Sequence, residues 1–128
     1  MKKGKTMDEK IKKLTDLIRV TSFAIHNYHG SGHLEKIYEN ALFHRLKIKG
    51  IIVEQQFPLK VYDEDGTVLG SYFVDLFIDS IIIELKACKC LADEHIAQLF
   101  SYLKSSRIRH GVLINFGASK LEIKKYIL

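Results

Sequence analysis

The sequence predicts a single α/β domain in which a mixed central β-sheet is flanked by helices. Three observations lead to this fold class. The chain has 128 residues, which suits one domain with one core. Apolar residues recur at three- and four-residue steps near the start of the chain and again around residue 100, as in amphipathic helices. Between these stretches, short runs of β-branched and aromatic residues are separated by turn signals, as in strands.

Two helices are expected before the sheet. Residues 7–29 place apolar side chains along one side and lysine and arginine along the other. The glycines within residues 30–32 end this helix. A second helix is expected over residues 34–49, with Gly50 as its stop. The apolar spacing predicts that three residues near the junction of the two helices are buried: Tyr28, Leu34 and Ile37.

A β-hairpin is expected next, formed by residues 51–62 and 67–78 around an Asp-Glu-Asp-Gly turn. Pro58 predicts that the first strand lies at an edge of the sheet or carries a bulge. A tight turn at Asp79 and Ser80 leads into residues 81–87, which are nearly all apolar, as in a strand buried on both faces.

A helix over residues 93–105 and a buried strand over residues 110–116 follow. The tail at 120–128 is expected to form a short helix or a closing strand. The predicted order is therefore ααβββαβ plus a tail, in one domain over residues 1–128.

Composition narrows the function classes. The net charge of +5 permits a polyanionic partner such as nucleic acid. Cys88 and Cys90, the only cysteines, complete neither a zinc nor an iron–sulfur ligand set and are interpreted as structural or incidental thiols. No apolar run approaches the roughly 20 residues that span a membrane. The basic start is not followed by an apolar signal region, so no membrane association and a cytoplasmic location are expected.

Three charged residues break the apolar pattern of the predicted central strands: Asp75, Glu84 and Lys86. Glu84 and Lys86 are two apart, so they project from one face of their strand. The short turn makes the neighbouring strands antiparallel, and the resulting register puts Asp75 opposite Glu84, with Cβ atoms about 4.5–5.5 Å apart. Two carboxylates this close repel each other unless a cation lies between them.

Such a site suits a hard divalent ion, Mg²⁺ or Mn²⁺. With Lys86 beside the carboxylates to orient water or hold a phosphate oxygen, it is suited to phosphodiester hydrolysis. The alternative is a buried ion network in which Lys86 pairs with Glu84 or Asp75 and no catalysis occurs. The residues alone leave both interpretations open.

Polar pairs on two predicted helices are less specific. Gln98 and Tyr102 stand four apart and share a helix face, as do Glu35 and Glu39. A carboxylate such as Glu35 near a helix N-terminus is favoured by the helix dipole alone. By themselves these pairs indicate only helix polarity.

Taken together, these residues resemble a family of small prokaryotic proteins named for its GxxExxY signature. Residues 32–38, Gly-His-Leu-Glu-Lys-Ile-Tyr, match that signature. The resemblance continues through residues 74–76, 83–87, 95–99 and 111–116 and covers the chain from about Leu17 onward. The family is similar to a branch of the PD-(D/E)XK nuclease superfamily. The resemblance implies a restriction-endonuclease-like αβββαβ core with an extra N-terminal helix.

The resemblance also implies roles for individual residues. Asp75 and Glu84 match the residues that bind Mg²⁺ or Mn²⁺, and Lys86 matches the lysine that assists the attacking water. Glu35 matches a helix glutamate that completes the metal shell. Gln98 and Tyr102 are similar to the Q-x-x-x-Y motif of RecB-like nucleases, which supports the site and contacts DNA.

Departures from the family pattern occur at Val74, where the superfamily name has proline, and in the loop at His29 and Ser31. None removes a catalytic residue. His26 and His95 match positions that are often histidine in the family, and we expect them to contact a phosphate near the site. The cluster of His26, His29 and His33 also suggests a transition-metal site, but loop histidines are more often solvated or capping.

Three functions remain open at this point. The first is a Mg²⁺- or Mn²⁺-dependent nuclease with DNA as the expected substrate. The second is a non-catalytic module that binds nucleic acid or protein, and the third is an accessory subunit of a defence or repair system. The complete set of Asp75, Glu84 and Lys86 favours the first. A homodimer is a further hypothesis, based on the small size and the long first helix.

Overall fold

The computed structural model describes residues 6–128, which form one α/β domain. Two helices come first, and a β-hairpin, a third strand, a helix and two more strands follow. The elements are α1 (Met7–His29), α2 (Glu35–Ile48), β1 (Glu54–Tyr62), β2 (Val68–Ile78), β3 (Ile81–Lys86), α3 (Asp93–Ser106), β4 (His110–Asn115) and β5 (Glu122–Ile127). The predicted fold class and element order are confirmed, and the tail forms the closing strand. Residues 1–5, part of the predicted domain, lie outside the described residues.

The five strands form one mixed sheet in the order β1-β2-β3-β4-β5. β3 and β4 are parallel, with α3 as their crossover, and the other neighbours are antiparallel. β1 is an edge strand, which agrees with the prediction from Pro58. Ile78 pairs with Ile81 across the turn at residues 79 and 80, as the turn length predicts.

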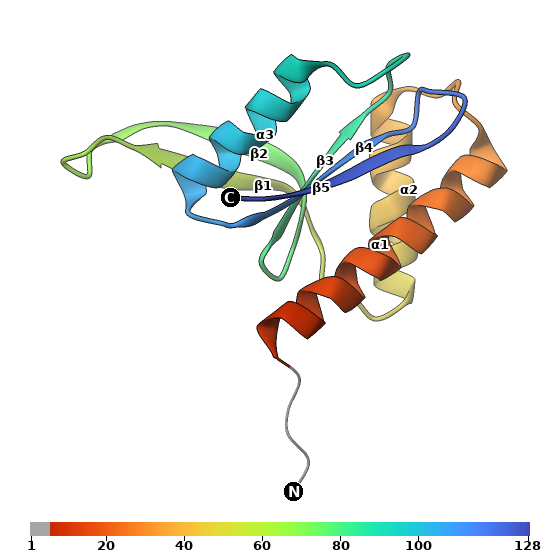
Figure 1. The fold of residues 1–128 in the computed structure, drawn as a ribbon, viewed down its shortest axis with the longest axis horizontal. Coiled ribbons are helices and arrows are strands. Elements are labelled where there is room, and N and C mark those ends of the chain that lie inside the picture. Colours follow the sequence, from red (N-terminus) through yellow and green to blue (C-terminus); the bar gives the residue numbers. More distant parts are fainter. Residues whose placement is uncertain (1–5) are drawn as a thin grey trace, which may run out of the picture.

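Helices cover both faces of the sheet, so the domain has three layers (Figure 1). α1 and α2 pack on one face over a core that includes Ile83, Leu85 and Ile114. α3 packs on the other face over a core that includes Ile82 and Leu113. The alternation of Ile82 and Ile83 between the two cores shows that β3 is buried on both sides, as its apolar run predicts. None of the helices in residues 6–128 has the length and apolar character needed to cross a membrane.

The junction between α1 and α2 is filled by Tyr38. Gly30 ends α1 with a φ of 73°, a conformation that glycine adopts without strain. The Tyr38 hydroxyl donates a hydrogen bond to the Gly30 carbonyl at 2.6 Å, and its ring stacks on Phe116. The prediction that Tyr28, Leu34 and Ile37 point inward is wrong, because all three are exposed. Leu34 precedes the first turn of α2, where the helical spacing used for the prediction does not apply.

At one position within the sheet, the side chains of β1 and β2 change the face toward which they point, a feature called the turnover below. Val74 packs beneath α3, whereas Leu76 packs beneath α1 and α2, although residues two apart in a regular strand share a face. On β1, Gln56 has a φ of 50°, and the pairing of its neighbours with Val74 and Leu76 places it across from Asp75. Asp75 therefore lies at this turnover, between Val74 and Leu76, whose side chains point to opposite faces of the sheet.

Candidate metal-binding and catalytic site

β2 and β3 separate at the candidate site, and two carboxylates occupy the gap. The last backbone pair on this side is Leu76 with Ile83. Beyond it, the Asp75 amide N–H donates to Glu84 Oε1 at 3.0 Å, and the Leu85 amide N–H donates to Asp75 Oδ2 at 2.8 Å. Asp75 and Glu84 face each other as the register predicts, but side chains replace the backbone hydrogen bonds between the strands. This exchange fixes both carboxylates against the backbone.

Burial and mutual repulsion disfavour full ionisation of the pair. Glu84 is 5% exposed. Its burial, together with the charge of Asp75, raises its pKa to about 8. Burial also raises the pKa of Asp75, against the opposing effect of the hydrogen bond from Leu85. Two carboxylates with raised pKa values are stabilised by an added positive charge, which either a proton or a metal cation can supply.

Lys86 lies on the same face of β3 as Glu84 and points toward α3. Its Nζ is 3.4 Å from Gln98 Oε1. In the described part of the chain, the side-chain ion pairs are Lys12–Asp16 and Lys36–Glu39. Lys86 therefore makes no direct ion pair with Asp75 or Glu84 there, and the predicted alternative, a closed ion network, is not formed. Its ammonium group remains available to a ligand.

Tyr102 lies one helical turn beyond Gln98 on α3 and is 7% exposed. Its ring lies 4.9 Å from that of Tyr72 on β2. Burial and the nearby charge of Glu84 raise the pKa of Tyr102 to about 12, so its hydroxyl keeps its proton at neutral pH. The predicted substrate contact by Tyr102 is not tested by this arrangement and stays a prediction.

Glu35 is the first residue of α2, and the charges of Asp75 and Lys86 both act on it. Partial burial and the charge of Asp75 raise its pKa, while Lys86 lowers it. Within residues 6–128, no three Asp, Glu, His or Cys side chains are grouped closely enough to hold an ion by themselves. The donor set nevertheless fits Mg²⁺ or Mn²⁺, which commonly take one or two carboxylates and complete their shell with water and phosphate. Asp75 and Glu84 supply those two, and the role of Glu35 as a further ligand stays a prediction.

Comparison with known proteins supports the same superfamily. The family described as the PD-(D/E)XK nuclease superfamily matches residues 12–126. The chain belongs to this superfamily. Its GxxExxY resemblance remains a finer prediction. No curated protein matches the sequence significantly.

The fold is also found in solved structures. The crystal structure of SSO0001 is similar to this PD-(D/E)XK domain with a TM-score of 0.60 at 20% sequence identity. The match covers 91% of this chain and 61% of SSO0001, so the domain spans about three fifths of that protein's length. At this identity the likeness supports the architecture alone.

In residues 6–128 of this PD-(D/E)XK domain, none of the four histidines His26, His29, His33 and His95 hydrogen-bonds to Asp75 or Glu84. His26 Nε2 is 2.9 Å from the Ala118 carbonyl. His95 Nδ1 accepts a hydrogen bond from the Ala92 amide at 3.0 Å, so a neutral ring carries its proton on Nε2, where it can be donated. The rings of His29 and His33 pack edge to face 5.6 Å apart. A phosphate contact by His26 or His95 stays a prediction.

Two polar residues next to the pair were not singled out as site residues by sequence reasoning. Gln56 Nε2 lies 3.4 Å from Asp75 Oδ1, and it donates to the buried carboxylate of Glu39 at 2.9 Å. The signal available in the sequence was weak: two successive glutamines in a predicted edge strand, and a glutamate one turn after Glu35 on the same helix face. Neither pattern shows which residue reaches Asp75.

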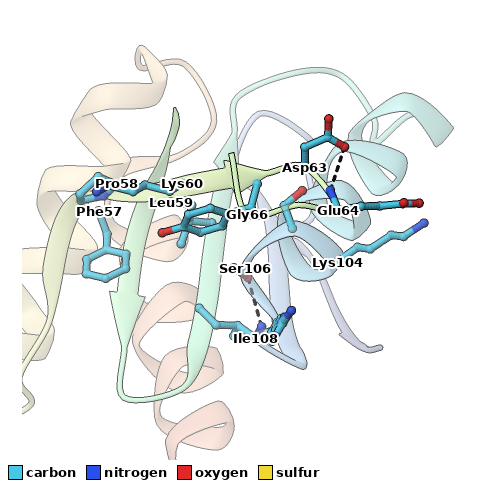
Figure 2. Close-up of a pocket in the computed structure, with 13 residues that line it drawn as sticks. Phe57, Pro58, Leu59, Lys60, Asp63, Glu64, Gly66, Lys104, Ser106 and Ile108 are labelled. Carbon is cyan, nitrogen blue, oxygen red and sulfur yellow. Dashed lines mark hydrogen bonds between the residues drawn. The ribbon is translucent and has the colours of Figure 1, made fainter. Parts of the chain in front are cut away.

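A groove of about 1060 Å³ lies between β1 with its hairpin turn and the end of α3. Figure 2 shows Lys60 and Lys104 among the residues that line it. Arg107 adds a third basic group, while Asp63 and Glu64 of the turn add two acidic ones. The candidate catalytic residues do not line the groove. Because α3 carries Gln98 near its middle and Lys104 in its last turn, the helix links the two regions.

Proposed function

We propose that this chain is a divalent-metal-dependent nuclease that hydrolyses phosphodiester bonds, with DNA as its substrate. One observation carries the proposal. Asp75 and Glu84 are each held by a backbone amide of the opposite strand across the gap between β2 and β3. Lys86 projects beside them toward α3 and, within residues 6–128, has no ion-pair partner. Two fixed carboxylates next to an available ammonium group suit the recognition of a cation and a phosphate together.

Each residue has a chemical task in this proposal. Asp75 and Glu84, with Glu35 beside them, would hold Mg²⁺ or Mn²⁺, which when bound acidifies water and stabilises negative charge on a phosphate. Lys86 holds a phosphate oxygen or orients the attacking water. Gln98 fixes the Lys86 ammonium group by accepting its hydrogen bond. Positioning of this kind aligns water with the phosphorus atom.

The choice of DNA rests on the superfamily and on the net charge of +5, which favours a polyanion. In this proposal, the part of the DNA strand that extends away from the reacting phosphate binds in the groove beside α3. A homodimer, and a cytoplasmic location, stay predictions.

A nuclease assay on the purified chain tests the proposal. With Mn²⁺ or Mg²⁺, the wild type should nick plasmid or degrade linear DNA, and EDTA should stop it. Lys86→Ala should lower activity by at least about 100-fold, since it removes a group that positions water or stabilises charge. Lys89→Ala is the matched control, because Lys89 is an exposed lysine of the following loop with no place in the site.

Two results would defeat the proposal. Equal activity in the wild type and Lys86→Ala would assign the cleavage to a contaminant. DNA binding without cleavage under any divalent metal would favour a binding module or an accessory subunit. Circular dichroism of each variant checks that the fold is kept.

A further inference from the structure

A buried carboxylate, Glu39 of α2, lies behind the candidate site. It is 3% exposed. Its Oε2 accepts hydrogen bonds from Lys36 and Gln55 at 2.6 Å each, and its Oε1 accepts one from Gln56 at 2.9 Å. With donors on both oxygens, this carboxylate is satisfied and fixed in position, so it provides an anchor.

Gln56 joins this anchor to Asp75. Its Nε2 also lies 3.4 Å from Asp75 Oδ1. An amide nitrogen carries two hydrogens, and both neighbours are carboxylates that only accept. The Gln56 amide therefore presents its NH₂ group to both, with one N–H toward Glu39 and the other toward Asp75.

The backbone of β1 makes this double contact possible. In a regular strand, Gln55 and Gln56 would point to opposite faces, yet both amides reach Glu39. The φ of 50° at Gln56 rotates its side chain to the same side. A non-glycine residue in the left-handed region is strained, and such strain persists where the surrounding structure requires that conformation.

We propose that Gln56, held by Glu39, is a positioning residue that orients the Asp75 carboxylate toward a divalent cation. The inference rests on the proposed function. Leu85 holds Asp75 Oδ2 and Gln56 holds Oδ1. A carboxylate has about four lone-pair positions, so each Asp75 oxygen keeps one for the ion. Partners that act through a metal ligand in this way typically change metal affinity or activity about 10–100-fold.

Mn²⁺ calorimetry on the full chain tests this role with Gln56→Gly. The substitution removes the amide, and glycine suits a φ of 50°, so the turnover of β1 is kept. We expect Mn²⁺ affinity to fall about 10–100-fold. Nuclease activity should return toward the wild-type kcat at saturating Mn²⁺, because the variant loses orientation of a ligand and no reacting group. Gln55→Ala is the matched control and should keep the wild-type affinity, since Gln55 does not contact Asp75 and Lys36 still donates to the Glu39 oxygen that Gln55 shares.

Amide NMR on the metal-free protein gives a second, independent readout. The Leu85 N–H donates to Asp75 Oδ2, so its proton shift reports the orientation of that carboxylate. Gln56→Gly should move the Leu85 resonance, whereas Gln55→Ala should leave it in place. An unmoved Leu85 resonance, or an unchanged Mn²⁺ affinity in Gln56→Gly, overturns the positioning role even if the wild type is an active nuclease. If the wild type binds no Mn²⁺ at all, the proposed function fails as well.

Discussion

At the scale of single residues, the molecule keeps a poorly solvated carboxyl group where an apolar residue would be more stable. Glu84 is surrounded by apolar strands and faces a second carboxyl group across a gap. Natural proteins tolerate such local costs mainly at functional sites. The burial of Glu84 lowers the free energy of unfolding, and this cost is explained if the carboxyl group serves to bind a ligand.

This cost predicts that Glu84→Gln stabilises the metal-free protein. The amide keeps an oxygen to accept from the Asp75 N–H and carries no charge. The folded pKa of Glu84 is raised from 4.5 to about 8, so the wild type loses stability as pH rises from about 4.5 to 8. We expect the variant to gain about 1–2 kcal/mol at pH 8 in EDTA, with little difference at pH 4.

Urea denaturation at the two pH values measures this difference. Added Mn²⁺ should stabilise the wild type more than the variant, because the variant lacks one of the two carboxylate ligands. A variant that is less stable than the wild type at pH 8 in EDTA would contradict the account of Glu84.

At the scale of elements, the segment after β3 is fixed by Asn115 at the end of β4. Asn115 is fully buried, and its Oδ1 accepts from the amides of Cys88 and Gly117 at 3.0 Å each. Its Nδ2 donates to the Cys88 carbonyl and to Glu122. Asn115 is also the register partner of Lys86. One amide therefore joins β3, β4 and β5 next to the lysine of the candidate site.

Asn115→Ala should cost roughly 2–3 kcal/mol of unfolding free energy, because it leaves buried backbone groups without partners. Chemical denaturation measures the loss, and Ser119→Ala, an exposed position in the same connection, should stay near the wild type. Nuclease activity should fall in Asn115→Ala under conditions where it is folded, since the end of β3 is no longer held. Equal stability of the two variants would show that Asn115 does not hold this segment.

Some features of these elements could be predicted from the sequence, and others could not. The short turn at Asp79 and Ser80 made the β2–β3 register predictable, and with it the approach of Asp75 to Glu84. The turnover at Gln56 was not predictable, because glutamine carries no preference for a positive φ and the conformation depends on tertiary contacts. The tail was ambiguous because its apolar residues fit either a helix or a strand, and pairing with β4 decides for the strand.

At the scale of the whole molecule, the two helical layers differ in what they contribute. α1 and α2 complete one core and bring Glu35 and Glu39 to the site, while α3 brings Gln98 and borders the groove in Figure 2. Basic residues occur both on α1, which carries Lys10, Lys12, Lys13 and Arg19, and along the groove, which is lined by Lys60, Lys104 and Arg107. If DNA follows the groove, lysines there should matter more than lysines on α1.

DNA binding in EDTA at several salt concentrations tests this asymmetry. The double variant Lys60→Ala/Lys104→Ala should weaken binding and reduce the slope of log K against log salt by about 1–2. The double variant Lys12→Ala/Lys13→Ala removes the same charge from α1 and should change the slope less. Fluorescence anisotropy with a labelled oligonucleotide supplies both slopes. Equal slopes for the two variants would indicate that DNA responds to the overall charge of the protein and does not bind along the groove.

The most direct measurement is a crystal structure grown with Mn²⁺, with diffraction data collected to locate manganese by its anomalous signal. The account predicts a peak in the gap between β2 and β3, bound by carboxylate oxygens of both Asp75 and Glu84. A peak confined to the histidines around the α1–α2 junction would contradict it. So would the absence of any peak between the two carboxylates at saturating Mn²⁺.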